Sequence, residues 1–194
     1  FGELQVDHLQ LVPQNNGWLG EELCETLKRA YPNTAFRLHA NVRALREYVV
    51  ADLSGFDVHL KWFEQAARLN RILGAQAYTA HAGTRAEASM LEMLDNARRA
   101  ADLFGCVVGV EGLYPTTADT YLVSTWDEYR QVFESGVPYA LDLSHLNILA
   151  KATGRQEQTL VTEMLACERC IEIHVSDNNG TGDQHRVCER TPWW

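Results

Sequence analysis

Histidines and carboxylates recur along this chain at spacings that could support metal binding or acid-base chemistry. The segment EIHVSDNNGTGDQH, residues 172–185, holds two histidines and two aspartates around a glycine-bearing turn. Asp183 and His185 stand two residues apart, so in an extended segment their side chains point the same way and could bind one ion. Imidazole and carboxylate groups together suit zinc, manganese or iron. The segment therefore indicates either a polar loop or part of a metal site.

Five polar residues stand at the ends of short apolar runs that predict β-strands. The runs LQVDHLQLV, AFRLHA, AQAYTAHAG, CVVGVEG, YALDLS and CIEIHVSD are rich in β-branched or aromatic residues. The last five of them end near His39, His81, Glu111, Asp142 and His174. From His81 onwards these residues are roughly 30 positions apart, which is the length of one β-α unit.

Stretches with helical spacing separate these strands. We expect helices over residues 19–30, 56–73, 86–104, 126–135 and 156–167. Two of them have a one-sided apolar stripe and are followed by Gly74 and Gly105, which predict helix ends. The predicted stripes are Phe56, Leu60, Phe63, Ala67 and Ile72 in the first, and Leu91, Leu94, Ala97, Ala101 and Phe104 in the second. Strands that alternate with helices imply parallel pairing through right-handed crossovers.

The alternation favours an α/β barrel over an open dinucleotide-binding sheet, because no predicted strand is followed by GxGxxG. We therefore predict a (β/α)8 TIM barrel. About six β-α units are recognisable, so two strands are either unrecognised or missing. A chain of 194 residues with 46% hydrophobic content suits one domain over residues 1–194.

A parallel barrel would bring the strand-end residues together, because the carboxyl ends of its strands converge on one face. Three further residues would join them from nearby loops: His145 in DLSH, and Asp183 and His185. A single histidine at a strand end is more often an ordinary hydrogen-bonded residue. A cluster of several histidines and carboxylates favours a bound ion, since an ion shared by the cluster removes the cost of burying unpaired charges. The sequence predicts a divalent metal site.

Composition narrows the partners of such a site. A formal charge of -9 argues against long-range attraction to nucleic acid or to an anionic membrane, and favours a small or neutral partner. Arginines near the predicted strand ends could hold a phosphate of a small substrate, or be ordinary surface residues. They are Arg37, Arg43, Arg46, Arg85 and Arg186.

Other features indicate a cytoplasmic protein. No apolar run is long enough to span a bilayer, and the N-terminus has no signal-type pattern. Five cysteines form an odd, scattered set, which predicts reduced thiols. CERC, residues 167–170, has the spacing of zinc or redox sites, but without a second pair we expect no function for it. The terminal PWW indicates either a partner surface, as in a homo-oligomer, or a helix that continues further.

The ordered polar residues resemble the ligand series of the xylose isomerase-like TIM barrels. This superfamily includes the endonuclease IV (AP endonuclease family 2) group and many sugar or sugar-phosphate isomerases and epimerases. The resemblance covers about residues 4–185. The matching segments are His39 in LHAN, His81 in HAG, Glu111 in VEG, Asp142 and His145 in DLSH, His174 in HVSDN, and Asp183 and His185 in DQH.

For the endonuclease IV type, the resemblance implies three zinc ions. The first would be held by His39, His81 and Glu111, the second by Glu111, Asp142 and His174, and the third by His145, Asp183 and His185. The family also uses a glutamate at the end of its last strand, and this sequence has no counterpart. The first strand here matches the family's second, so we expect the first and last strands of the family to be lacking.

The leading interpretation is a divalent-metal-dependent isomerase or epimerase of a sugar or sugar phosphate, working through an ene-diolate. Zinc or manganese is the expected metal, with iron as an alternative. Glu111 and His145 are the catalytic candidates, and Arg37, Arg43, Arg85 and Arg186 the substrate-binding ones. The alternatives are a multinuclear zinc phosphodiesterase, a multinuclear iron oxidase on the same barrel, and a degenerate barrel that only binds. Asn178, Gly180 and Gly182 would shape the loop that presents Asp183 and His185.

Overall fold

A computed structural model of the chain describes residues 7–12, 17–40, 42–189 and 191–194. Within them the strands are β1 (His8–Leu11), β2 (Ala35–Leu38), β3 (Ala77–His81), β4 (Val107–Glu111), β5 (Tyr139–Asp142) and β6 (Cys170–His174). The helices are α1 (Glu21–Ala30), α2 (Leu60–Leu73), α3 (Met90–Phe104), α4 (Trp126–Glu134), α5 (Leu143–Thr153) and α6 (Gln158–Ala166), with a 3-10 turn η1 (Leu53–Gly55). Strands and helices alternate along the chain, as predicted.

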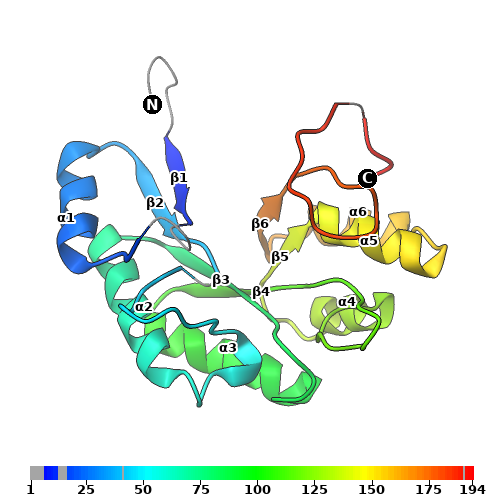
Figure 1. Cartoon of the computed structure of the whole chain (residues 1–194), viewed down its shortest axis with the longest axis horizontal. Helices are drawn as coiled ribbons and strands as arrows, with labels where there is room; N and C mark the ends of the chain where they lie inside the picture. The colour runs from blue at the N-terminus through cyan, green and yellow to red at the C-terminus, as the bar shows by residue number, and fades with distance from the viewer. Residues whose placement is uncertain (1–6, 13–16, 41, 190) are drawn as a thin grey trace.

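Every strand pairing is parallel. β1 pairs with β2, and the other strands form a sheet in the order β3-β4-β5-β6. Figure 1 shows the strands as a curved wall with α2, α3 and α4 outside it. The predicted α/β barrel architecture is confirmed, with six strands in the part of the chain that is described.

The wall curves until its first and last strands face each other across the interior. Gln10 on β1 donates a hydrogen bond to Glu172 on β6, at 2.5 Å between Nε2 and Oε1. Arg37 on β2 pairs with the same carboxylate, at 3.3 Å between Nη1 and Oε2. The Thr79 hydroxyl on β3 lies 3.3 Å from Oε1. A polar group of side chains, rather than an apolar layer, therefore connects the strands inside the barrel.

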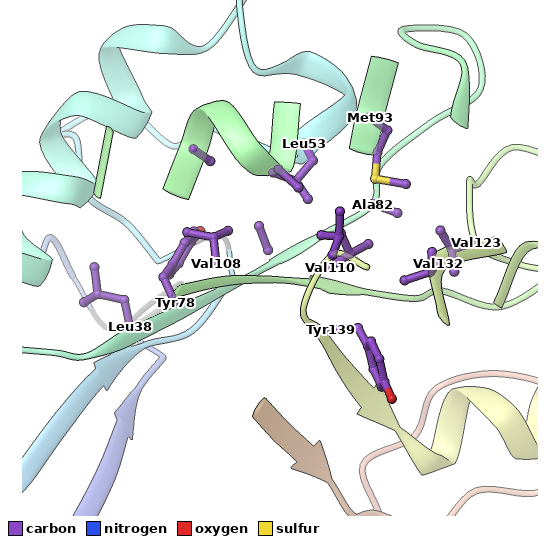
Figure 2. Close-up of a cluster of buried hydrophobic side chains, with 14 of the residues drawn as sticks. Leu38, Leu53, Tyr78, Ala82, Met93, Val108, Val110, Val123, Val132 and Tyr139 are labelled. Atoms are coloured by element: carbon purple, nitrogen blue, oxygen red, sulfur yellow. The ribbon is translucent and has the colours of Figure 1, made fainter. Parts of the chain in front are cut away.

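The apolar core lies between the strands and the outer helices. Successive strand residues point to opposite faces, so one set faces the helices while its neighbours face the interior. Figure 2 shows part of this core, in which Tyr78, Val108 and Val110 of the strands lie near Leu53 and Met93. Tyr78 and Met93 are fully buried. Packing against helices on the outside fixes which strand residues point into the barrel.

The helix signals were largely correct. Gly74 and Gly105 follow α2 and α3 with φ of 68° and 67°, a left-handed conformation that glycine adopts without strain. Two helix starts are set by signals that were not among the predictions: Ser89 and Thr125 each form a complete capping box with the glutamate three residues later.

Three details of the prediction were wrong. α5 was not predicted, and it begins immediately after β5 because the Asp142 side chain caps it. Leu60 and Leu91 were placed on the apolar stripes of α2 and α3, yet they are 39% and 80% exposed, because each lies in the first turn of its helix outside the face that packs on the core. His59 precedes α2 as its N-cap instead of lying within it.

Among the described residues, no helix combines the length and apolar character needed to cross a membrane.

Candidate metal centre

A cavity of about 450 Å³ opens at the carboxyl ends of the strands. Four of the predicted ligands are the last residues of β3 to β6, and His39 directly follows β2. The cavity is lined by all eight predicted ligands, His39, His81, Glu111, Asp142, His145, His174, Asp183 and His185, together with Gln10, Val12, Val175 and Ser176. Predicted ligands up to 146 positions apart, from His39 to His185, thus share one pocket.

His39, Glu111 and His174 form a first three-residue group. Each offers one possible ligand atom, and these atoms lie within 4.8 Å of one another. The His39 and His174 rings stack with centroids 5.4 Å apart, and Nδ1 of His174 lies 3.1 Å from Oε1 of Glu111. Two imidazoles and a carboxylate at this separation could hold one divalent ion.

Glu111, Asp142 and His145 form a second group, again with one possible ligand atom each within 4.8 Å. Asp142 uses Oδ1 to accept hydrogen bonds from the backbone N–H groups of Ser144 and His145, which leaves Oδ2 facing the cavity. His145 is fixed by its other nitrogen, since Nδ1 lies 2.9 Å from the carbonyl oxygen of Gly112. A ring oriented in this way presents Nε2 as a ligand. Both groups contain Glu111.

Asp183 and His185 extend the second group. Oδ2 of Asp183 lies 3.0 Å from Nε2 of His185 and 3.6 Å from Nε2 of His145. Asn178 supports this loop, because its side chain donates to the Ser144 carbonyl at 2.8 Å and accepts from the Gly180 N–H. The loop glycine Gly180 has φ of 74°.

Two carboxylates near the cavity were missed at the sequence level. Oδ1 of Asp52, just before η1, lies 3.4 Å from Nδ1 of His81. Glu172 lies 2.5 Å from Nε2 of His174, so it holds that ring with Nδ1 toward Glu111. The alternation in EIH places Glu172 on the same side of β6 as His174, and this signal could have identified it. No comparable pattern marks Asp52.

The charges of the cluster favour a cation. Burial opposes the charged imidazoles, but Glu111 and Asp52 raise the pKa of His81 to about 9. Burial likewise opposes charge on His174, and hydrogen bonds to Glu111 and Glu172 raise its pKa to about 10. Glu111 is buried, which disfavours its charge, yet His81 and His174 lower its pKa to about 2. Protons on the histidines balance the negative charge of the carboxylates, and a bound metal ion could do so in their place.

The residues present fit a metal ion by a second criterion. Among the described residues, two buried carboxylate oxygens that belong to members of the cluster have no hydrogen-bond partner, Oε2 of Glu111 and Oδ1 of Asp183. A buried acceptor without a partner is costly, and coordination to a cation would satisfy it.

The four predicted substrate-binding arginines lie elsewhere in the described structure, since none is among the residues that line the cavity. Arg37 pairs with Glu172 inside the barrel, and Arg85 pairs with Glu128 and Asp119. Arg43 donates to the Arg46 carbonyl, and the backbone of Arg186 pairs with Asp177. Their roles as substrate contacts stay predictions.

No protein-family model matches the chain, and no curated protein matches its sequence. Solved structures do match its fold. A D-tagatose 3-epimerase-like protein superposes with a TM-score of 0.67 at 16% identity, over 94% of this chain and 72% of that one. Endonuclease IV from Thermus thermophilus gives 0.58 at 14% identity, over 92% and 79%. AP endonuclease family 2 from Brucella melitensis gives 0.61 at 16% identity, over 88% and 68%.

The chain shares the α/β-barrel fold of these solved structures. That confirms the resemblance inferred from the strand-end residues at the level of the fold. Because the sequence identities lie between 14% and 16%, the similarity supports a shared fold only. The reaction has to be inferred from the residues of the cavity.

Proposed function

We propose that this protein is a divalent-metal-dependent enzyme that isomerises or epimerises a small sugar or sugar phosphate. Glu111 carries the proposal. It is 1% exposed, belongs to both three-residue groups, and has an oxygen, Oε2, with no hydrogen-bond partner among the described residues. A carboxylate in this position can bind an ion and also exchange a proton with a substrate held beside it.

The cavity supports a small substrate. Its volume of about 450 Å³ lies in the range of pockets that enclose small molecules. Gln10 and Ser176 add polar groups to its lining, which suit a polyhydroxylated ligand. The formal charge of -9 disfavours a nucleic-acid duplex, whose binding relies on basic side chains.

The residues that would hold an ion are Glu111, Asp142 and His174, with His39 and His145 beside them. A divalent ion in this position would polarise a carbonyl and a neighbouring hydroxyl of the substrate. Glu111 would take the proton from the hydroxyl-bearing carbon next to the carbonyl and return it to the former carbonyl carbon, while the hydroxyl proton would move to the former carbonyl oxygen. The two proton transfers at carbon in an isomerisation need only this one carboxylate. Epimerisation needs a second proton donor on the opposite face of the carbon, so isomerisation is the form that Glu111 can perform alone.

A second candidate function is phosphoester hydrolysis on a small substrate. The observation that favours it is the sharing of Glu111 by two ligand groups, since enzymes with paired ions use both to stabilise the attacking and leaving oxygens. Two divalent ions would also outweigh the charges of Glu111, Asp142 and Asp183, and a phosphate would then be attracted to the cavity.

The test combines metal content with isotope exchange. Protein purified without added metal is analysed for bound elements, then incubated in D2O with Mn²⁺ or Zn²⁺ and a panel of ketoses, aldoses and their phosphates. We expect loss of the proton signal at the carbon next to the carbonyl, measured by NMR. Glu111→Gln should abolish the exchange, and Glu163→Gln, a change at an exposed site on α6, should not.

Other outcomes would separate the alternatives. Release of phosphate without exchange would favour the hydrolase, and consumption of oxygen by the iron-loaded protein would favour an oxidase. A protein that binds none of these metals at micromolar concentration would refute both candidate functions.

A further inference from the structure

Cys167 and Cys170 lie at the end of the barrel opposite the metal centre. They flank the tight turn that joins α6 to β6, and β6 then runs from Cys170 to His174 at the cavity (Figure 1). Both cysteines are free and half-buried. They belong to the CERC motif, which the proposed function does not use.

The turn keeps the two cysteines close together. The backbone N–H of Cys170 donates to the carbonyl oxygen of Cys167 at 2.9 Å, a bond between residues three positions apart. Such a turn holds its first and last Cα atoms less than about 7 Å apart. Disulfides span Cα separations of roughly 4.4–6.8 Å. The backbone is therefore already arranged for a short disulfide loop.

The two thiols have different surroundings. The backbone N–H of Arg169 hydrogen-bonds the Cys167 sulfur and lowers the pKa of that thiol. The Arg169 guanidinium also acts on the Cys167 thiol. Its position is fixed because it lies over the Phe133 ring and donates to the Phe133 carbonyl oxygen at 2.8 Å. Burial raises the pKa of Cys170. A partly exposed thiol near a fixed positive charge is the typical attacking cysteine, and a neighbouring one can resolve the adduct.

We propose that Cys167 and Cys170 form a redox-active dithiol that low-molecular-weight disulfides oxidise to an intramolecular disulfide. The Cys167 thiolate attacks one sulfur of the external disulfide, forming a mixed disulfide and releasing one thiolate. The Cys170 thiolate then attacks the Cys167 sulfur, forming the internal bond and releasing the second thiolate. The two cysteines lose two electrons and two protons, and the external disulfide becomes two thiols.

The structure provides an internal control in Cys24. It is fully buried on α1, and burial raises the pKa of its thiol to about 11. An oxidant that unfolds the protein would expose this thiol, whereas site-specific oxidation would leave it unmodified.

The test uses the intact chain in glutathione buffers that range from fully reduced to fully oxidised. Samples are quenched with acid, alkylated and mapped by mass spectrometry. We expect the peptide that contains both cysteines to lose two alkylatable thiols as an internal disulfide. Cys170→Ser should accumulate a glutathione adduct at Cys167, and Cys167→Ser should react more slowly at Cys170. Circular dichroism melting curves verify that both variants are folded.

Two results would overturn the proposal. The first is that both thiols stay fully alkylatable in oxidised glutathione while the protein remains folded. The second is that the two serine variants trap glutathione at equal rates, since this would show that the turn does not distinguish the two thiols.

Discussion

Glu172→Gln is the substitution that best tests how the barrel interior supports the metal centre. Glu172 is not in the cavity lining, yet its Oε1 lies 2.5 Å from Nε2 of His174. Its partners Gln10, Arg37 and Thr79 fix the carboxylate from three other strands. The His174 ring is thereby held with Nδ1 toward Glu111. Glutamine preserves the size of the side chain and removes its charge.

The substitution is expected to weaken binding of the metal ion without unfolding the protein. A carboxylate behind a ligating histidine orients the ring and increases its basicity, and loss of such a group typically lowers metal affinity by about 10- to 100-fold. That range corresponds to roughly 1.4–2.8 kcal/mol of binding free energy. A glutamine can still accept hydrogen bonds from Gln10 and Arg37, so most of the interior contacts should persist.

The measurement is the affinity for Zn²⁺ by competition with a chromophoric chelator, for the wild type, Glu172→Gln and the surface control Glu163→Gln. Thermal melting of the ion-free proteins shows whether the fold is intact. An affinity within twofold of the wild type, in a variant that melts normally, would refute the reasoning, because His174 would then either not bind the ion or not depend on Glu172.

Further predictions concern protons, packing and capping. Zn²⁺ binding at pH 7.5 should release about two protons, from His81 and His174, measured by calorimetry in two buffers of different ionisation enthalpy; a heat independent of the buffer would contradict this. Both histidines have pKa values raised above the unfolded value of about 6.5, so their contribution to the stability of the ion-free chain is complete below that pH. It should be lost as the pH rises to about 9 for His81 and about 10 for His174, and a urea midpoint that stays constant over this window would disprove the assignment. Gly112→Ala would place a Cβ atom 2.4 Å from the Tyr129 ring and should destabilise the fold by about 1–3 kcal/mol in chemical denaturation, where an unchanged midpoint would count against the packing argument. Ser89→Ala removes the capping box of α3 and should cost about 1 kcal/mol by the same measurement, and a stabilised variant would contradict the cap.

Several elements could be predicted from the sequence because their causes are local. The glycines after α2 and α3 act within one turn, so the helix ends they set are visible in the letters alone. The capping boxes of Ser89 and Thr125 are equally local, but they were not among the predictions. α5 was missed because its cap, Asp142, is also the end of β5, and most of the 11 residues that follow are buried, as in a strand of the core. Leu91 was misplaced because the buried face of α3 is centred on Met93, Ala97, Ala100 and Phe104, and Leu91 lies outside that face.

Residue type and position along the chain determined which side chains reach the mouth of the barrel. In a strand every second residue faces the same way, and parallel strands place their carboxyl ends together, so spacing was enough to select the five strand-end residues of the cavity. His145, Asp183 and His185 were added because they stand in loops that follow these strand ends. Only the tertiary structure decided what supports them. Asp52 meets His81 from before η1, Glu172 meets Gln10 and Arg37 across the barrel, and the predicted arginines pair with other groups outside the cavity lining. These contacts join separate strands and loops at distances set by the curvature of the whole wall, and no local pattern encodes that curvature.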